Sequence, residues 1–133
     1  MAADKMRFDI LTLPGDGIGP EVIVETLKVL EAVSQKTGMI FDISEALAGG
    51  AAIDGEGAPI SDETLERARN ADAVLLGAVG GIKWDDLPTN QRPEKGLLKL
   101  RASLDLFANL RPAQVFGPLE SSSTLRPEIL KGI

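Results

Sequence analysis

The sequence of 133 residues contains no cysteine, no histidine and no tyrosine. The absence of cysteine excludes disulfides and zinc–thiolate sites, and it is consistent with a reducing compartment. Without histidine and tyrosine, general acid–base chemistry falls to Asp, Glu and Lys, and nucleophilic chemistry to these residues together with Ser and Thr. For an enzyme, this is a small set of catalytic side chains.

Long apolar runs and an excess of positive charge are also missing. No apolar run reaches the roughly 20 residues that a membrane-spanning helix needs, so no membrane partner is expected. The first residues, MAADKMRF, lack the apolar core of a secretory signal, and we therefore expect a cytoplasmic protein. The net charge of −6 argues against a nucleic-acid partner, because such binding depends on Lys and Arg that neutralise phosphates.

The apolar pattern predicts alternating strands and helices within roughly one domain. Strands are expected at 8–13, 40–47, 73–76 and 106–110, and helices at 20–36, 61–70, 93–105 and 127–131. Residues 51–60 are expected to form a connection, and residues 77–92 a long loop. This order predicts an α/β fold with a largely parallel sheet and flanking helices. Such sheets bind ligands beyond the carboxyl ends of their strands.

The glycine-rich turn at 14–19 follows the first predicted strand and matches a Rossmann fingerprint only in part. In Gly-x-Gly-x-x-Gly the third glycine allows close packing of helix on strand. Here that glycine, Gly19, comes one position early, and Pro20 occupies the expected place. Asp42 or Glu45 could serve as the acidic residue that follows the fingerprint. We nevertheless favour a tight strand-to-helix turn over a dinucleotide-binding fingerprint.

One face of the fourth predicted helix carries an acid, two leucines and an arginine: Glu94, Leu97, Leu98 and Arg101. Because buried charges are costly unless they are paired, this is an unusual core face. It fits either an amphipathic helix whose arginine reaches solvent, or a surface for a ligand with an anionic and an apolar end. Arg111 favours the second interpretation, since two arginines suit bidentate carboxylate recognition. A lone arginine at a strand end is more often a salt-bridge partner.

The long loop at 77–92 is rich in glycine and contains the single tryptophan, Trp84. Loops of this length in compact domains are typically functional or disordered. The adjacent Asp85 and Asp86 do not predict a metal site, because neighbouring aspartates in a loop are usually solvated. No metal ligand is predicted in the sequence.

Five stretches, in this order, resemble the isocitrate/isopropylmalate family of β-decarboxylating dehydrogenases. They are LPGDGIGPE from Leu13, GGAAID from Gly49, the stretch from Leu76 to Trp84, RPEKGLLKLR from Arg92, and DLFANLRPA from Asp105. No single stretch decides the family, but the five together are specific and cover nearly the whole chain. The resemblance implies that family's α/β fold rather than a Rossmann domain. It also implies that the chain is an N-terminal part of such an enzyme, with the fold incomplete.

The resemblance assigns binding residues position by position. The substrate-binding residues that it implies are Arg101 and Arg111 for the carboxylates, and Leu97 and Leu98 for an isopropyl group. The cofactor-binding residues that it implies are Ile18, Gly81, Ile82, Lys83, Trp84 and Glu94. The two leucines favour isopropylmalate over isocitrate, because a third carboxylate would lose its hydration there, whereas a buried isopropyl group gains about 1.5–3 kcal/mol.

The family reaction implies oxidative decarboxylation of 3-isopropylmalate to 4-methyl-2-oxopentanoate, with reduction of NAD, in leucine (branched-chain amino acid) biosynthesis. The resemblance also implies Mg²⁺ or Mn²⁺ and a homodimer. The family's catalytic tyrosine and lysine and its metal-binding aspartates match no position here and are expected beyond residue 133, so the chain alone is expected to be inactive. Residues 1–106 are expected to belong to the first, cofactor-side domain and residues 107–133 to begin the second, dimerisation domain. The alternative is a non-catalytic or regulatory binding module of the same family, but both substrate arginines are present.

Overall fold

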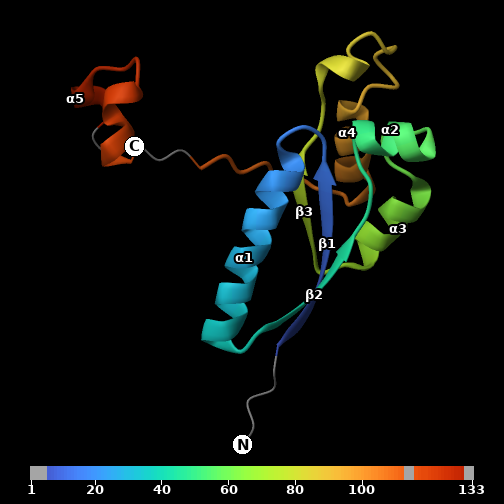
Figure 1. The fold of residues 1–133 in the computed structure, drawn as a ribbon, viewed down its shortest axis with the longest axis horizontal. Helices are drawn as coiled ribbons and strands as arrows, with labels where there is room; N and C mark the ends of the chain where they lie inside the picture. Colours follow the sequence, from blue (N-terminus) through green and yellow to red (C-terminus); the bar gives the residue numbers. More distant parts are fainter. Residues whose placement is uncertain (1–5, 113–115, 131–133) are drawn as a thin grey trace, which may run out of the picture.

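The computed structural model describes residues 6–112 and 116–130, and its centre is a parallel sheet of three strands (Figure 1). The strands are β1 (Arg7–Gly15), β2 (Ile40–Glu45) and β3 (Ala73–Ala78), in the order β2-β1-β3. The helices are α1 (Gly19–Thr37), α2 (Gly50–Glu56), α3 (Asp62–Asn70), α4 (Glu94–Ser103) and α5 (Pro127–Leu130), with short 3-10 helices η1 (Ile82–Trp84) and η2 (Gly117–Ser122). The predicted α/β fold with a parallel sheet is confirmed.

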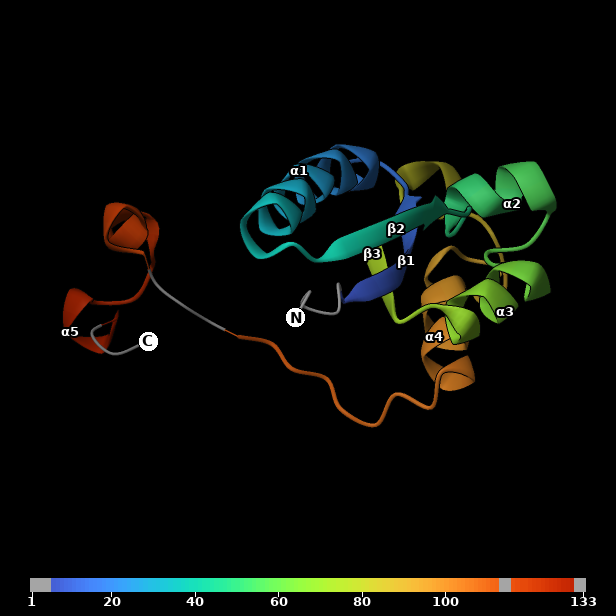
Figure 2. The same ribbon diagram turned by 90° about the horizontal axis from the view of Figure 1, so that it is seen from below.

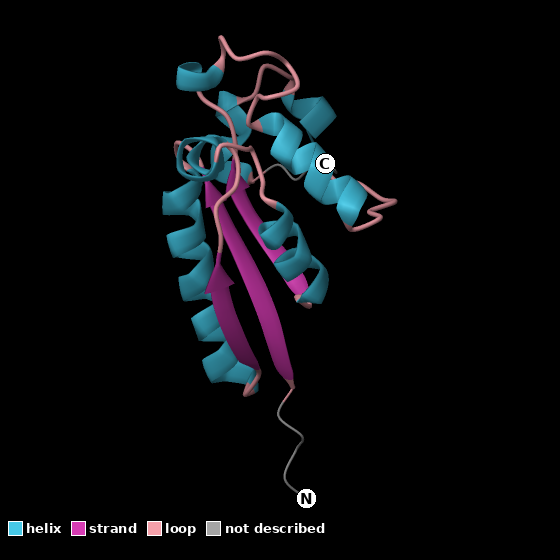
Figure 3. Ribbon diagram, turned by 90° about the vertical axis from the view of Figure 1, so that its right-hand side faces the viewer, coloured by secondary structure: helices cyan, strands magenta, loops and turns pink. Residues whose placement is uncertain are grey.

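Helices cover both faces of the sheet, as Figures 2 and 3 show: α1 lies on one face, and α3 and α4 lie on the other. The core between the sheet and α3 and α4 contains Leu11 and Leu13 of β1, with Leu65 of α3 and Leu100 of α4. β1 is the central strand and the most deeply buried one, because it is paired on both sides. The layers leave the loops at the carboxyl ends of the strands free to form a site.

Local signals fix the ends of the two best-predicted helices. Pro20 stands at the start of α1, and Gly38 ends that helix in the left-handed conformation, with its N–H donating to the carbonyl of Ser34. Ser61 caps α3, where its Oγ accepts the N–H of Thr64 at 3.2 Å. Both helices therefore form close to where the sequence predicts them.

Two predictions of secondary structure are wrong. The segment after Gly49 is not a simple connection, because residues 50–56 form α2. Residues 106–110 form no strand: they are extended, and the side chains of Phe107 and Leu110 are exposed. A strand needs a neighbour for its backbone hydrogen bonds, and no described residues pair with this segment.

Smaller differences concern β3 and the chain's end. β3 extends to Ala78, beyond the predicted range 73–76, and it is half-buried, because among the described residues it is paired only with β1. The helix predicted at 127–131 is found at Pro127–Leu130, and residue 131 lies outside the described residues. None of the helices within residues 6–112 and 116–130 combines the length and the apolar character of a membrane span.

Candidate functional site

The loops at the carboxyl ends of the three strands meet around one buried side chain, that of Asp16. Its side chain accepts three backbone N–H groups: Gly50 at 2.7 Å and Gly80 at 2.8 Å on Oδ2, and Ala51 at 2.7 Å on Oδ1. Asp16 is only 5% exposed. Three N–H donors compensate a buried carboxylate for its lost hydration. Two of them open α2, so the carboxylate also caps that helix at the end of its dipole that favours an anion.

The glycine turn that holds Asp16 packs closely on β3. The Asp16 N–H donates to the carbonyl of Ala78 at 2.7 Å, and a Cβ on Gly19 would lie 2.7 Å from the Ala78 nitrogen. Only glycine permits this approach of the start of α1 to β3. The favoured interpretation of a tight strand-to-helix turn agrees with this geometry. Ile18, within the turn, is 59% exposed.

The cofactor-side loop is attached to α2. The indole of Trp84 lies so close to Gly50 that a side chain there would collide with the ring. Trp84 Nε1 donates to Asp54 Oδ1 at 3.3 Å, and Lys83 Nζ donates to Asp54 Oδ2 at 2.5 Å. The Lys83 ammonium holds the pKa of Asp54 below its ordinary value. These contacts fix one side of the loop, whereas Ile82 between them is 89% exposed.

Glu94 links this loop to α4. A Cβ on Gly80 would lie 2.6 Å from Glu94 Oε1, so the carboxylate is in contact with the loop backbone. The structure thus brings Glu94 and the loop together, as the predicted cofactor site requires. Gly81, the next residue, packs beside the Trp84 ring.

The core-facing side of α4 is not the side that carries the predicted substrate residues. Gly96 and Leu100 are buried, and Gly96 approaches the carbonyl of Pro59 so closely that no side chain would fit. Leu97 is half-buried, and Leu98 is 52% exposed. Arg101 is partly buried and, among the described residues, its side chain makes no hydrogen bond or ion pair. The face that was predicted to bind a ligand is therefore available.

Arg111 is not brought to this face. It lies in the extended segment after α4, and its Nε donates to Asn109 Oδ1 at 3.5 Å. No hydrogen bond or ion pair joins it to α4 in the described ranges, so the convergence of the two arginines stays a prediction. Figure 1 shows this segment leaving the body of the sheet.

Two contributors to the site, Asp16 and Asp54, were not predicted from the sequence. Asp16 stood inside the glycine motif, but its hydrogen-bond donors lie 34, 35 and 64 residues away. Asp54 belongs to the Gly-Gly-Ala-Ala-Ile-Asp stretch, and only the unpredicted α2 places it beside Lys83. The signal that could have identified Asp16 is an aspartate between two glycines at the end of a buried strand.

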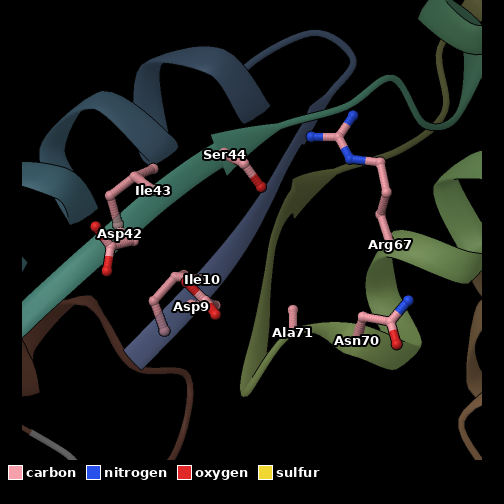
Figure 4. Close-up of a pocket in the computed structure, with 8 residues that line it drawn as sticks. All are labelled: Asp9, Ile10, Asp42, Ile43, Ser44, Arg67, Asn70 and Ala71. Carbon is pink, nitrogen blue, oxygen red and sulfur yellow. The ribbon is translucent and has the colours of Figure 1, made fainter. Parts of the chain in front are cut away.

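One pocket, of about 290 Å³, lies at the carboxyl ends of β1 and β2, where Pro14, Pro20, Leu47 and Ala51 are among the residues that line it. No cluster of three or more metal-binding side chains occurs within residues 6–112 and 116–130. A pocket of about 300 Å³ lies elsewhere, between β1, β2 and the end of α3 (Figure 4). It is lined by Asp9, Asp42, Arg67 and Asn70 among others, and Arg67 Nη2 donates to the carbonyl of Glu45 at 2.8 Å. None of the predicted site residues lines it.

Fold and site together define an α/β protein whose parallel sheet gathers glycine-rich loops and one helix face at its carboxyl edge, without a Rossmann turn. Residues 9–133 match the family model described as isocitrate/isopropylmalate dehydrogenase. The chain belongs to this family.

The similarity extends to curated relatives and solved structures. The chain is 57% identical over 128 residues to a 3-isopropylmalate dehydrogenase of Pseudomonas fluorescens, covering 96% of this chain and 36% of the relative. A β-decarboxylating dehydrogenase of Thermococcus kodakarensis shares the fold with a TM-score of 0.64 and 37% identity, over 81% of this chain and 30% of that one. An isocitrate dehydrogenase of Methylococcus capsulatus gives 0.58 and 34%, over 82% and 29%. The chain thus spans about a third of the length of the curated relatives it matches.

Proposed function

We propose that this chain supplies the substrate-binding helix and part of the cofactor site of an NAD-dependent 3-isopropylmalate dehydrogenase. The observation that carries the proposal is the outer face of α4, where exposed Leu98 lies between half-buried Leu97 and an Arg101 that has no partner among the described residues. The relatives that share 57% identity are 3-isopropylmalate dehydrogenases, which favours that substrate.

Each end of the substrate has a matching group on this surface. The guanidinium of Arg101, joined by that of Arg111, binds the malate carboxylates through paired N–H donors. Leu97 and Leu98 cover the isopropyl group, whose burial is worth about 1.5–3 kcal/mol. Isocitrate carries a third carboxylate at this position, and the leucines offer that group no hydrogen bond.

The nicotinamide end of NAD lies against Ile18, the loop Gly81–Trp84 and Glu94. Their fit rests on the exposed apolar side chains of Ile18 and Ile82, beside the backbone of Gly80 and Gly81, which Glu94 and Trp84 approach closely. NAD, when bound, accepts the hydride from the substrate's 2-hydroxyl carbon. The role of this chain's residues is to orient the ring and to exclude water from it.

The family's divalent metal, Mg²⁺ or Mn²⁺, does not fit the described residues, which contain no suitable cluster of ligands. Residues 1–106 are proposed to belong to the cofactor-side domain, and residues 107–133 to the dimerisation domain of a cytoplasmic homodimer.

A hybrid enzyme tests this function. In the hybrid, the present chain replaces the matching segment of the Pseudomonas fluorescens relative, which supplies the rest of the subunit. We expect the hybrid to reduce NAD with 3-isopropylmalate and to discriminate strongly against isocitrate. The unaltered relative is the control. A folded dimeric hybrid without activity would support the non-catalytic binding module instead, and a preference for isocitrate would refute the substrate assignment.

A further inference from the structure

Asp16 is buried at the centre of the site loops, yet the proposed function gives it no contact with substrate or cofactor. Its three N–H donors come from two separate segments, the first turn of α2 and the start of the loop that follows β3. Gly49, just before α2, approaches the same carboxylate so closely that only glycine fits. The Asp16 side chain therefore fixes the position of the first turn of α2 relative to the start of the loop after β3. These two segments have no other hydrogen bond to each other at the Gly80 end of the loop.

The far end of the loop is held by α2 itself. The Trp84 ring packs on Gly50, and Asp54 accepts hydrogen bonds from both Trp84 and Lys83. Because Asp16 also binds the N–H of Gly50, displacement of α2 would carry the Trp84 contact with it. The loop is thus attached to Asp16 directly through Gly80 and indirectly through α2.

Gly80 also connects this arrangement to α4. The Glu94 carboxylate lies against the Gly80 backbone, at 2.6 Å from the position that a Cβ would occupy. A shift of Gly80 would therefore change the space open to Glu94. Every residue that is assigned to the cofactor site, except Ile18, is in contact with a segment that Asp16 holds.

We propose that Asp16 is a positioning residue that sets the loop Gly80–Trp84 and, through it, the cofactor surface. Its relevance to NAD rests on the proposed function, but the loop's attachment is a property of the chain without ligands. The competing explanation is that Asp16 only stabilises the fold. The two differ in where the effect of a substitution appears.

Hydrogen exchange measured by NMR on the chain distinguishes them. Asp16→Asn keeps the side-chain size but turns one acceptor into an NH₂ donor that faces backbone N–H groups. We expect amide protection at the three donors to fall about 10- to 100-fold, which corresponds to losing hydrogen bonds to a charged acceptor. The fluorescence of Trp84, the only tryptophan, should shift to longer wavelength as its ring becomes exposed. Protection in β1 should change much less.

Two further variants serve as controls. Asp72→Asn removes a carboxylate that accepts the Asp9 N–H at 2.8 Å near the opposite end of the sheet, and it should leave the Trp84 signal unchanged. Asp54→Asn weakens only the outer attachment, so Trp84 should respond while the Gly80 amide stays protected. An Asp16→Asn chain with lower protection spread uniformly over β1 and the loop, and with normal Trp84 emission, would overturn the proposal.

If the Asp16→Asn variant does not fold, native-state hydrogen exchange of the unaltered chain distinguishes the two explanations. The amides of Gly50, Ala51 and Gly80 should then exchange through one common opening with the same free energy. Independent openings of α2 and the loop would overturn the proposal. Since no cofactor is present, neither result depends on whether the chain's function is assigned correctly.

Discussion

The two leucines Leu98 and Leu100 lie on the same helix but are predicted to serve opposite purposes. Leu100 is 4% exposed and packs in the cluster with Leu11 and Leu13, so Leu100→Ala should destabilise the fold by about 2–5 kcal/mol. Leu98 is 52% exposed, and alanine has a slightly higher helix propensity than leucine. Leu98→Ala should therefore change the free energy of unfolding by no more than about 0.5 kcal/mol.

Their effects on the hybrid enzyme should be reversed. Leu98→Ala removes apolar contact with the isopropyl group. It should lower kcat/KM for 3-isopropylmalate roughly 5- to 150-fold, which corresponds to about 1–3 kcal/mol of lost transition-state stabilisation. Malate lacks the isopropyl group, so its residual turnover should change much less. Leu100→Ala should lower stability while leaving the ratio of the two substrates near that of the unaltered hybrid.

Urea unfolding of the chain, followed by circular dichroism, measures the first effect, and steady-state kinetics with both substrates measures the second. If Leu98→Ala destabilised the chain as much as Leu100→Ala, the outer face of α4 would be part of the core. Equal losses with 3-isopropylmalate and malate would show that Leu98 does not contact the isopropyl group.

Three further predictions concern charge, pH and the isolated chain. In the hybrid, Arg101→Lys and Arg111→Lys should each lower kcat/KM at least about tenfold, because an ammonium cannot reproduce the bidentate guanidinium contact; near-normal turnover in either variant would indicate a structural salt bridge. The contact with Lys83 lowers the pKa of Asp54 in the folded chain. This contact should therefore persist from neutral pH down to the ordinary aspartate pKa of 3.8, and it should be lost as the pH falls through the lower pKa of the folded chain. Trp84 fluorescence should change only in strong acid, and a transition near neutral pH would argue against this attachment. The 133-residue chain alone should not reduce NAD with 3-isopropylmalate, because the family's catalytic tyrosine and lysine and its metal-binding aspartates match none of its positions. Measurable turnover would contradict this expectation.

Local patterns were sufficient for part of the fold. α1 and α3 were predictable because residues at their ends determine where they begin or end. Pro20 and Gly38 do this for α1, and Ser61 does it for α3. The face of α4 could likewise be read from helical periodicity, although its exposure could not, since this depends on Gly96 approaching Pro59.

The missed features depend on contacts between distant residues. α2 begins at Gly50, directly after Gly49, and no side chain of a neighbouring residue caps it. Its first amides are instead bound by Asp16, 34 and 35 residues earlier. The strand predicted at 106–110 has suitable apolar residues. A strand, however, forms only beside a neighbouring strand, and the β propensity of its own residues does not provide one. For the same reason, the position of Arg111 relative to α4 could not be derived from its place in the sequence.

The most direct test of the proposed function is a crystal structure of the hybrid enzyme with 3-isopropylmalate and NAD. We expect the nitrogens of Arg101 and Arg111 within about 2.7–2.9 Å of the malate carboxylate oxygens, which is the range for charge-assisted hydrogen bonds. The isopropyl group should lie on Leu97 and Leu98, with the nicotinamide beside Glu94. A substrate bound away from the outer face of α4, with Arg101 directed to solvent, would contradict the assignment of this site.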